Sequence, residues 1–311
     1  MITMALAADS GFAKQLGAAL ASISSTQDED QRVFVLNHGF DPALRRDVEW
    51  GAPSAEVTWV DVDTRVLADI QVPPYLGAAS IFRLLLPSLL PAHVDRFIYL
   101  DADVLVRAPL GALWSTDLAG ASTGAVRDAV IPWAGSPGAL PWRALGLEPT
   151  CPYFNVGVLL VDLDRWRADG TADKALGLVR RRDLNHADQC AINIALGGAL
   201  LQLDATWNVQ AGHYLADESA AWLVESADAL DRALADPVVV HFNTSPLGRP
   251  WASNCSHPYR DEWFEALDRT AWAGWRPNRR RELLGQLTEG GLPRRLTRRV
   301  EVAGRVLLHG E

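Results

Sequence analysis

Two carboxylates separated by one residue follow a buried apolar stretch of this chain. Asp101 and Asp103 come directly after residues 97–100, whose side chains are all aliphatic or aromatic. In α/β proteins ligands bind beyond the carboxyl ends of the strands, so a strand that ends here would place both acids at a site. With one residue between them, extended backbone would direct both side chains to the same side. Such a pair can hold a divalent cation, although Asp-x-Asp is also a common loop composition.

Further polar side chains interrupt or end other apolar stretches. Asp9 follows the first apolar stretch, so we expect it on the same sheet edge as Asp101 and Asp103. Asn155 interrupts the apolar run 153–160, and a buried amide must be hydrogen-bonded. The remaining candidates are Asp128 after a predicted strand, Asp188 and Gln189 at the start of a predicted helix, and His241 after the last apolar stretch.

Length and composition indicate a globular enzyme. A chain of 311 residues with 49% hydrophobic and 22% charged residues can bury a sizeable core, as one large or two modest domains. The net charge of −9 argues against nucleic-acid binding, which requires a basic surface. No apolar stretch is long enough for a membrane helix, and residues 1–8 lack the features of a signal peptide. An odd number of cysteines, three, fits a reducing cytoplasm.

The predicted elements alternate between strands and helices. This alternation predicts an α/β fold with a mostly parallel central sheet that helices cover on both faces. An acidic N-cap, Asp41, precedes the second helix, and residues 128–152 form the longest irregular stretch. The predicted strands are 2–7, 32–36, 57–62, 97–100, 156–161 and 238–240, and the predicted helices are 13–23, 42–50, 78–90 and 186–196.

The end of the chain is basic. Residues 275–311 contain nine arginines and few acids. A basic amphipathic segment can lie on an anionic membrane surface, which would place the protein peripherally at the inner face of a membrane. The alternative is a solvated terminal helix that frays.

Several of these motifs, taken in order, resemble glycosyltransferase family 8, the retaining nucleotide-sugar transferases that include glycogenin and bacterial lipopolysaccharide galactosyl- and glucosyltransferases. The similarity spans residues 1 to about 255. The matching segments are 7–9, 81–84, 99–106, 153–160, 187–189 and 241–251.

The resemblance implies a GT-A fold for a catalytic domain at 1–270, and from its composition we expect the Arg-rich segment 271–311 to form a separate basic helical tail. Within the domain it implies a nucleotide-binding half at about 1–110 and an acceptor half at about 111–270. It also implies UDP-glucose or UDP-galactose as donor and a divalent cation, Mn²⁺ or else Mg²⁺. A cation on the diphosphate would stabilise the negative charge that develops as the sugar leaves.

The resemblance also assigns roles to individual residues. The cation ligands would be Asp101, Asp103 and His241, and the imidazole would favour manganese over magnesium. The residues implied at the sugar and reaction centre are Asp128, Asp188 and Gln189. The residues implied in donor binding are Ala7, Ala8, Asp9, Arg83, Asp101, Ala102, Asp103, Asn155, Gly248 and Arg249.

Each of these assignments has a structural alternative. Asp9 could cap the segment that follows it, a role compatible with donor binding, and Asp128 could equally be a cap in its loop. Arg83 could form an ordinary ion pair on a helix surface, and His241 could be a hydrogen-bonded structural histidine. Arg249 stands where the family usually has lysine, and its planar fork differs from an ammonium in reach and geometry.

Retention of the anomeric configuration leaves two mechanisms open. The family position opposite the leaving group is occupied by Gln189, a poor nucleophile, which favours attack by the acceptor on the leaving-group side. A covalent intermediate on Asp188 is the alternative.

Other protein classes fit less well. A haloacid dehalogenase-like phosphatase places its Asp-x-Asp at the first strand and needs a later lysine, and a nicotinamide dehydrogenase needs Gly-x-Gly-x-x-Gly after the first strand. A catalytically inactive sugar-nucleotide-binding relative also remains open. The acceptor is undetermined between a glycan such as a lipopolysaccharide core, a lipid-linked glycan, a protein and a small metabolite.

Overall fold

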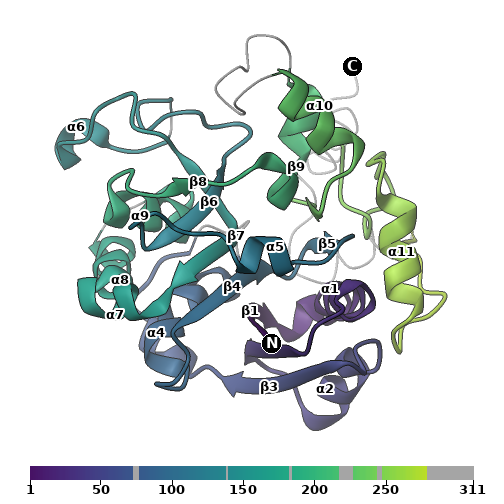
Figure 1. The fold of residues 1–311 in the computed structure, drawn as a ribbon. Coiled ribbons are helices and arrows are strands. Elements are labelled where there is room, and N and C mark those ends of the chain that lie inside the picture. Colours follow the sequence, from purple (N-terminus) through teal and green to yellow (C-terminus); the bar gives the residue numbers. More distant parts are fainter. Residues whose placement is uncertain (73–76, 138, 182–183, 217–226, 244–246, 279–311) are drawn as a thin grey trace, which may run out of the picture.

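A seven-stranded sheet runs through the centre of the molecule (Figure 1). The computed structural model describes residues 1–72, 77–137, 139–181, 184–216, 227–243 and 247–278. Along the sheet the strand order is β3 (Ala55–Asp61), β2 (Gln31–His38), β1 (Ile2–Asp9), β4 (Arg96–Asp101), β7 (Phe154–Asp162), β6 (Thr123–Arg127) and β8 (Leu201–Gln202).

Both faces of this sheet are covered, because its central strands are apolar on both sides. In β1, Ala5 and Ala7 belong to one hydrophobic cluster, while Met4 and Leu6 belong to another. The first cluster packs against α3 (Ala79–Phe82), α4 (Leu86–Leu89), α7 (Leu163–Asp169), α8 (Thr171–Arg181) and α9 (Ala187–Leu196). The second packs against α1 (Ala13–Thr26), α2 (Pro42–Glu49) and α10 (Ala227–Ala235). Burial on both faces is typical of parallel strands.

A smaller sheet lies beyond the end of β4. Its order is β5 (Val104–Val106), β10 (Val239–His241) and β9 (Val209–Gln210). The strand β10 is antiparallel to β5 and parallel to β9. The remaining short helices are α5 (Gly111–Trp114), α6 (Trp142–Leu145) and the 3₁₀ turns η1 (Ser10–Phe12), η2 (Thr64–Leu67), η3 (Arg83–Leu85), η4 (Ala205–Asn208) and η5 (Ala211–Leu215).

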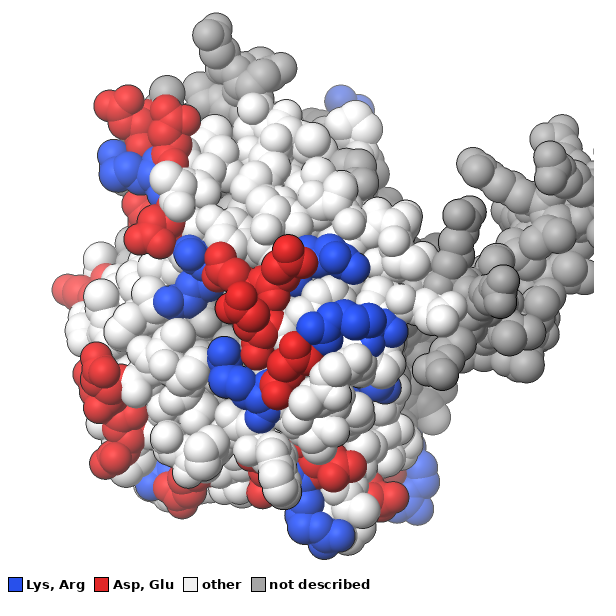
Figure 2. Space-filling model, turned by 90° about the vertical axis from the view of Figure 1, so that its right-hand side faces the viewer, with Lys and Arg blue, Asp and Glu red and all other residues white. Residues whose placement is uncertain are grey.

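The face that carries α11 (Arg260–Asp268) is rich in charge (Figure 2). Acidic side chains gather across its middle, with basic side chains beside them. Arg107, just after β5, pairs with Asp236 at 3.2 Å and with Glu262 of α11 at 2.7 Å. Exposed ion pairs of this kind contribute at most about 1 kcal/mol each. The Arg107–Glu262 pair adds to the apolar packing of α11 on the smaller sheet, in which Trp263 and Phe264 share one buried cluster with Leu105 and Val240.

The α/β fold and the mostly parallel sheet predicted from the sequence are confirmed. Strands β3, β2, β1 and β4 are parallel to one another, as are β6 and β8. One departure is β7, which runs antiparallel to both of its neighbours, β4 and β6.

The predicted helix 78–90 is divided into α3, η3 and α4. Pro87 lies in the first turn of α4 and has no N–H to donate to the preceding turn. Its ring also crowds the carbonyl group of that turn, so the backbone tightens to a 3₁₀ turn at 83–85 before the proline.

Within the described part of the chain, no helix is long and apolar enough to cross a membrane. Most of the basic tail, residues 279–311, lies outside the described residues, so its contact with a membrane stays a prediction. The described Arg276 pairs with Asp268 at 2.7 Å. The division into a domain at 1–270 and a tail at 271–311 also stays a prediction.

Candidate active site

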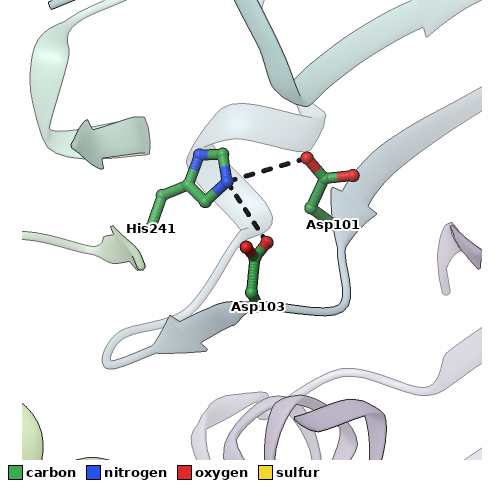
Figure 3. Close-up of side chains that lie close together, drawn as sticks. All are labelled: Asp101, Asp103 and His241. Atoms are coloured by element: carbon green, nitrogen blue, oxygen red, sulfur yellow. Dashed lines mark ion pairs between the residues drawn. The ribbon is translucent and has the colours of Figure 1, made fainter. Parts of the chain in front are cut away.

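The two carboxylates lie at the junction of the two sheets. Asp101 is the last residue of β4, Ala102 and Asp103 form a turn, and Val104 begins β5. The expectation of extended backbone through this pair was therefore wrong, because the chain changes sheets here. The turn nevertheless directs both carboxylates toward one side chain, His241 (Figure 3).

His241 reaches the acids through the pairing of β10 with β5. His241 is opposite Val104, and the N–H of Phe242 donates to the Asp103 carbonyl at 2.9 Å. The imidazole Nε2 lies 3.2 Å from Asp103 Oδ1 and 3.6 Å from Asp101 Oδ2 (Figure 3). The three residues offer ligand atoms that all lie within 4.8 Å of one another. Two carboxylate oxygens and an imidazole nitrogen suit a divalent ion such as Mn²⁺.

The acids and the imidazole change each other's protonation. Burial alone would lower the pKa of His241, but Asp103 and Asp101 beside it raise that pKa above its usual value. Burial would likewise raise the pKa of Asp103, yet His241 and Arg249 hold it below its usual value. A proton on Nε2 therefore stabilises the two carboxylates, and a cation that binds all three groups must displace that proton.

Gly157 of β7 leaves the room that this cluster needs. A Cβ atom at this position would lie 2.1 Å from His241 Cε1 and 2.8 Å from Asp101 Oδ2. Neither distance is compatible with a side chain, so the strand requires glycine where the imidazole crosses it. The donor set and this space together fit a bound cation.

Arg83 joins Asp101 to Asp188 in the interior. Its guanidinium lies 2.7 Å from Asp101 Oδ1 and 2.9 Å from Asp188 Oδ2, and it also donates to the Val156 carbonyl at 2.6 Å. The guanidinium packs over the Tyr99 ring at 4.5 Å. Burial raises the pKa of Asp188 to about 6, against the opposing effect of Arg83. Arg83 is thus buried, which excludes the alternative of an ordinary pair on a helix surface.

Asp128, Asn155 and Gln189 form a second buried cluster. Asp128 Oδ2 accepts from Gln189 Nε2 at 3.0 Å and from Asn155 Nδ2 at 3.3 Å. Its other oxygen accepts from the backbone N–H groups of Val130 and Ile131. Asp128 therefore caps the loop and also contacts the two amides, while its contact with a sugar stays a prediction.

Asn208, which the sequence analysis did not select, connects the two clusters. Its Oδ1 lies 3.1 Å from His241 Nδ1, and its Nδ2 donates to Asn155 Oδ1 at 2.9 Å. The side chain is fully buried. Its position at the end of a short 3₁₀ turn, without a motif around it, gave no signal that could have identified it.

Two adjoining cavities meet at these residues. The first lies at the carboxyl end of β1, where Asp9 also caps η1 by accepting from the Gly11 N–H at 3.0 Å. The first is lined by Ala7, Ala8, Asp9, Phe12, Gly77, Ala79, Ser80, Arg83, Tyr99, Asp101, Ala102, Asp103 and Arg249. The second is lined by Ser80, Arg83, Asp101, Asp103, Asp128, Val130, Ile131, Pro137, Asn155, Val156, His186, Asp188, Gln189, His241, Asn243 and Arg249.

The fold thus brings nearly all the predicted site residues to one place. Gly248 is the exception: it lines neither cavity but directly precedes Arg249, which lines both. Gly248 has φ +75°, a conformation that favours glycine. Residues 244–246 of the same predicted segment lie outside the described residues.

Comparison with known proteins agrees with this geometry. The sequence model of glycosyl transferase family 8 matches residues 3–255 of this chain. The chain is 27% identical over 277 residues to General stress protein A of Bacillus subtilis, covering 85% of this chain and 92% of that protein. It is 27% identical over 214 residues to the lipopolysaccharide 1,2-glucosyltransferase of Escherichia coli. That match covers 67% of this chain and 62% of the glucosyltransferase.

Two solved structures of the galactosyltransferase LgtC share the fold. Their TM-scores are 0.73 and 0.70, at 24% identity, and each match covers 90% of this chain and 99% of LgtC. The predicted GT-A fold is therefore confirmed. The family match gives no support to the phosphatase hypothesis.

We predict that Gly157→Ala weakens the binding of Mn²⁺ at least about tenfold, because the new methyl group would displace the imidazole. The measurement is a calorimetric titration of Mn²⁺ into each protein. Gly177→Ala in α8 is the matched control, since its Cβ would meet only the flexible end of Arg181 at 2.9 Å. Equal affinity of Gly157→Ala and the unchanged protein would contradict the prediction.

Proposed function

Because this chain belongs to glycosyl transferase family 8, we propose that it is a metal-dependent retaining hexosyltransferase that moves glucose or galactose from a UDP-sugar to an acceptor hydroxyl. The convergence of Asp101, Asp103 and His241 carries this proposal. The names of the similar lipopolysaccharide 1,2-glucosyltransferase and of the galactosyltransferase LgtC support these two sugars. LgtC was solved with donor and acceptor sugar analogues.

The first cavity is the proposed site of the nucleotide. Ala7, Ala8 and Asp9 end β1 at its wall, where backbone N–H groups can donate hydrogen bonds to a base, and backbone carbonyls and the Asp9 carboxylate can accept them. Arg249 lies at the border of the two cavities, close enough to Asp103 to lower the pKa of that carboxyl. A guanidinium there can bind diphosphate oxygens with two parallel hydrogen bonds. Gly248 would allow the backbone before Arg249 to turn toward the phosphates.

Asp101, Asp103 and His241 would hold the cation at the same border. The bound cation would stabilise the negative charge on the diphosphate as the sugar departs. Arg83 fixes one of these ligands, because its guanidinium binds Asp101 Oδ1 at 2.7 Å. Ala102, between the two acids, is buried and lines the first cavity, so its backbone would lie beside the donor.

The second cavity is the proposed site of the hexose and the acceptor. Asp128, Asn155 and Gln189 line it with hydrogen-bonding groups that are held in place by one another. Asp188 contributes a buried carboxylate whose charge is opposed by Arg83. Sugar hydroxyls can bind to such groups as both donors and acceptors.

These contacts favour attack on the leaving-group side of the sugar. Gln189 is a neutral amide, and the Asp188 carboxylate is engaged by Arg83 at 2.9 Å, which reduces its nucleophilicity. In the proposed step the bond from C1 to the phosphate oxygen breaks while the acceptor oxygen bonds to C1 on the same face. The departing phosphate oxygen takes the proton of the acceptor hydroxyl. Retention then needs no covalent sugar–enzyme intermediate.

The proposed function predicts release of UDP from UDP-glucose or UDP-galactose by the purified protein with Mn²⁺, measured by chromatography. We expect EDTA to abolish this release and Asp103→Asn to lower it at least about 100-fold, because the charge on the diphosphate loses its stabilisation. Asp47→Asn, an exposed position on α2, is the control and should retain full activity. Failure to bind or turn over any UDP-sugar would sink the proposal, and release of inorganic phosphate without UDP would favour a phosphatase.

The proposed mechanism predicts that Gln189→Ala lowers turnover only in part, by about 10- to 100-fold, since a hydrogen-bonding group is lost but no nucleophile. Turnover of this variant and of the unchanged protein should be measured with the better donor. Mass spectrometry of the protein incubated with donor provides the counter-test. A hexose found covalently on Asp188 would overturn same-face attack.

The affinity for Mn²⁺ should rise with pH. The pKa of His241 is raised above its usual 6.5, and the imidazolium must lose a proton to bind a cation. Affinity should therefore fall about tenfold for each pH unit below the raised pKa and level off above it. Titrations between about pH 5 and 8 test this expectation. An affinity that stays constant across this range would mean that the imidazole is not a ligand.

A further inference from the structure

A continuous set of buried hydrogen bonds runs from His241 to the sugar cavity. His241 Nδ1 lies 3.1 Å from Asn208 Oδ1, and Asn208 Nδ2 lies 2.9 Å from Asn155 Oδ1. Asn155 Nδ2 then reaches Gln189 Oε1 at 3.2 Å and Asp128 Oδ2 at 3.3 Å. The proposed cation site and the proposed hexose site are therefore joined by two asparagines.

The direction of every bond in this set follows from one backbone group. The N–H of Gly157 can only donate, and it lies 2.9 Å from Asn155, so the atom that accepts there is the Asn155 oxygen. The Asn208 atom that faces this same oxygen must be its NH₂ group. The other end of Asn208 is then a carbonyl oxygen, which only accepts. His241 must consequently carry a hydrogen on Nδ1.

From these hydrogen-bond directions we infer that Asn208 is a positioning residue for the cation site. It holds the His241 imidazole with Nδ1–H toward Asn208, so Nε2 faces Asp101 and Asp103 and offers its lone pair to a cation there once the Nε2 proton has been displaced. The inference rests on the proposed function, because it requires that a cation binds Nε2. It assigns a role to a residue that touches neither the carboxylates nor a donor cavity.

The burial of Asn208 makes this role difficult for another group to take over. Asn208 and His241 are both almost completely buried, at 0% and 3% exposure, so water has little access to Nδ1. If Asn208 lost its oxygen, the imidazole could turn, or it could move its hydrogen to Nε2 and present no lone pair. Groups that orient a metal-binding histidine in this way typically contribute about 10- to 100-fold to metal affinity.

Two variants at this position separate its two hydrogen bonds. Asn208→Leu has a similar shape and makes neither bond. Asn208→Asp keeps an oxygen that accepts from Nδ1–H but cannot donate to Asn155. Thr123→Val is a matched control for the loss of a buried hydrogen bond, since Thr123 is fully buried and accepts from Trp166 Nε1 at 2.7 Å, at the opposite end of β6 from Asp128.

The test is a titration with Mn²⁺ alone, followed by the electron paramagnetic resonance signal of the free ion, together with a thermal melt of each protein. We expect Asn208→Leu to weaken Mn²⁺ binding about 10- to 100-fold. Asn208→Asp should restore most of the affinity. Thr123→Val should bind Mn²⁺ like the unchanged protein although its melting temperature falls.

The inference would be overturned by unchanged Mn²⁺ affinity in Asn208→Leu, or by an affinity in Asn208→Asp as weak as in Asn208→Leu. A loss of Mn²⁺ affinity in Asn208→Leu that is no greater than the loss in Thr123→Val would also overturn it. Such a loss would follow from lowered stability alone. Absence of Mn²⁺ binding by the unchanged protein would be a different failure. It would remove the proposed cation site itself.

Discussion

The pairing of two short strands, β5 and β10, determines the architecture of this site. Three residues of each strand form an antiparallel ladder, and the bond from the Phe242 N–H to the Asp103 carbonyl extends it by one step. This ladder brings His241 to two carboxylates that precede it by about 140 positions in the chain. Backbone hydrogen bonds fix the register, so the imidazole cannot slide along the acids without breaking the small sheet.

A second constraint is that the site is polar and yet buried. Each buried polar group must have a partner, and here the same few groups serve one another. Arg83 pairs with two carboxylates, Asp128 accepts from two amides, and Asn208 bonds to both clusters. The groups proposed to bind a sugar nucleotide are therefore in position before it arrives, which lowers the free energy needed to organise them. Gly157 is part of the same arrangement, since any side chain would occupy the place of the imidazole.

Much of the fold and most of the site could be predicted from the sequence. The alternation of apolar strands with helices indicated the α/β sheet. The polar residues at strand ends indicated where a site would form, because the carboxyl ends of parallel strands lie along the same edge of the sheet. Local patterns could not reveal the direction of β7, whose apolar run is equally compatible with a parallel or an antiparallel neighbour. The turn at Ala102 was also missed, since nothing in Asp-Ala-Asp marks a change of sheets. Asn208 has no motif, and its role depends on contacts with residues more than 30 positions away.

The central claim is that one cation is bound by two carboxylates and by Nε2 of His241. Pulsed electron paramagnetic resonance of the protein with one equivalent of Mn²⁺ tests it most directly, because a coordinated imidazole nitrogen couples to the unpaired electrons of the ion. The account predicts a nitrogen coupling in the unchanged protein and its disappearance in His241→Ala. Bound Mn²⁺ without any nitrogen coupling, or a coupling that persists in His241→Ala, would contradict it.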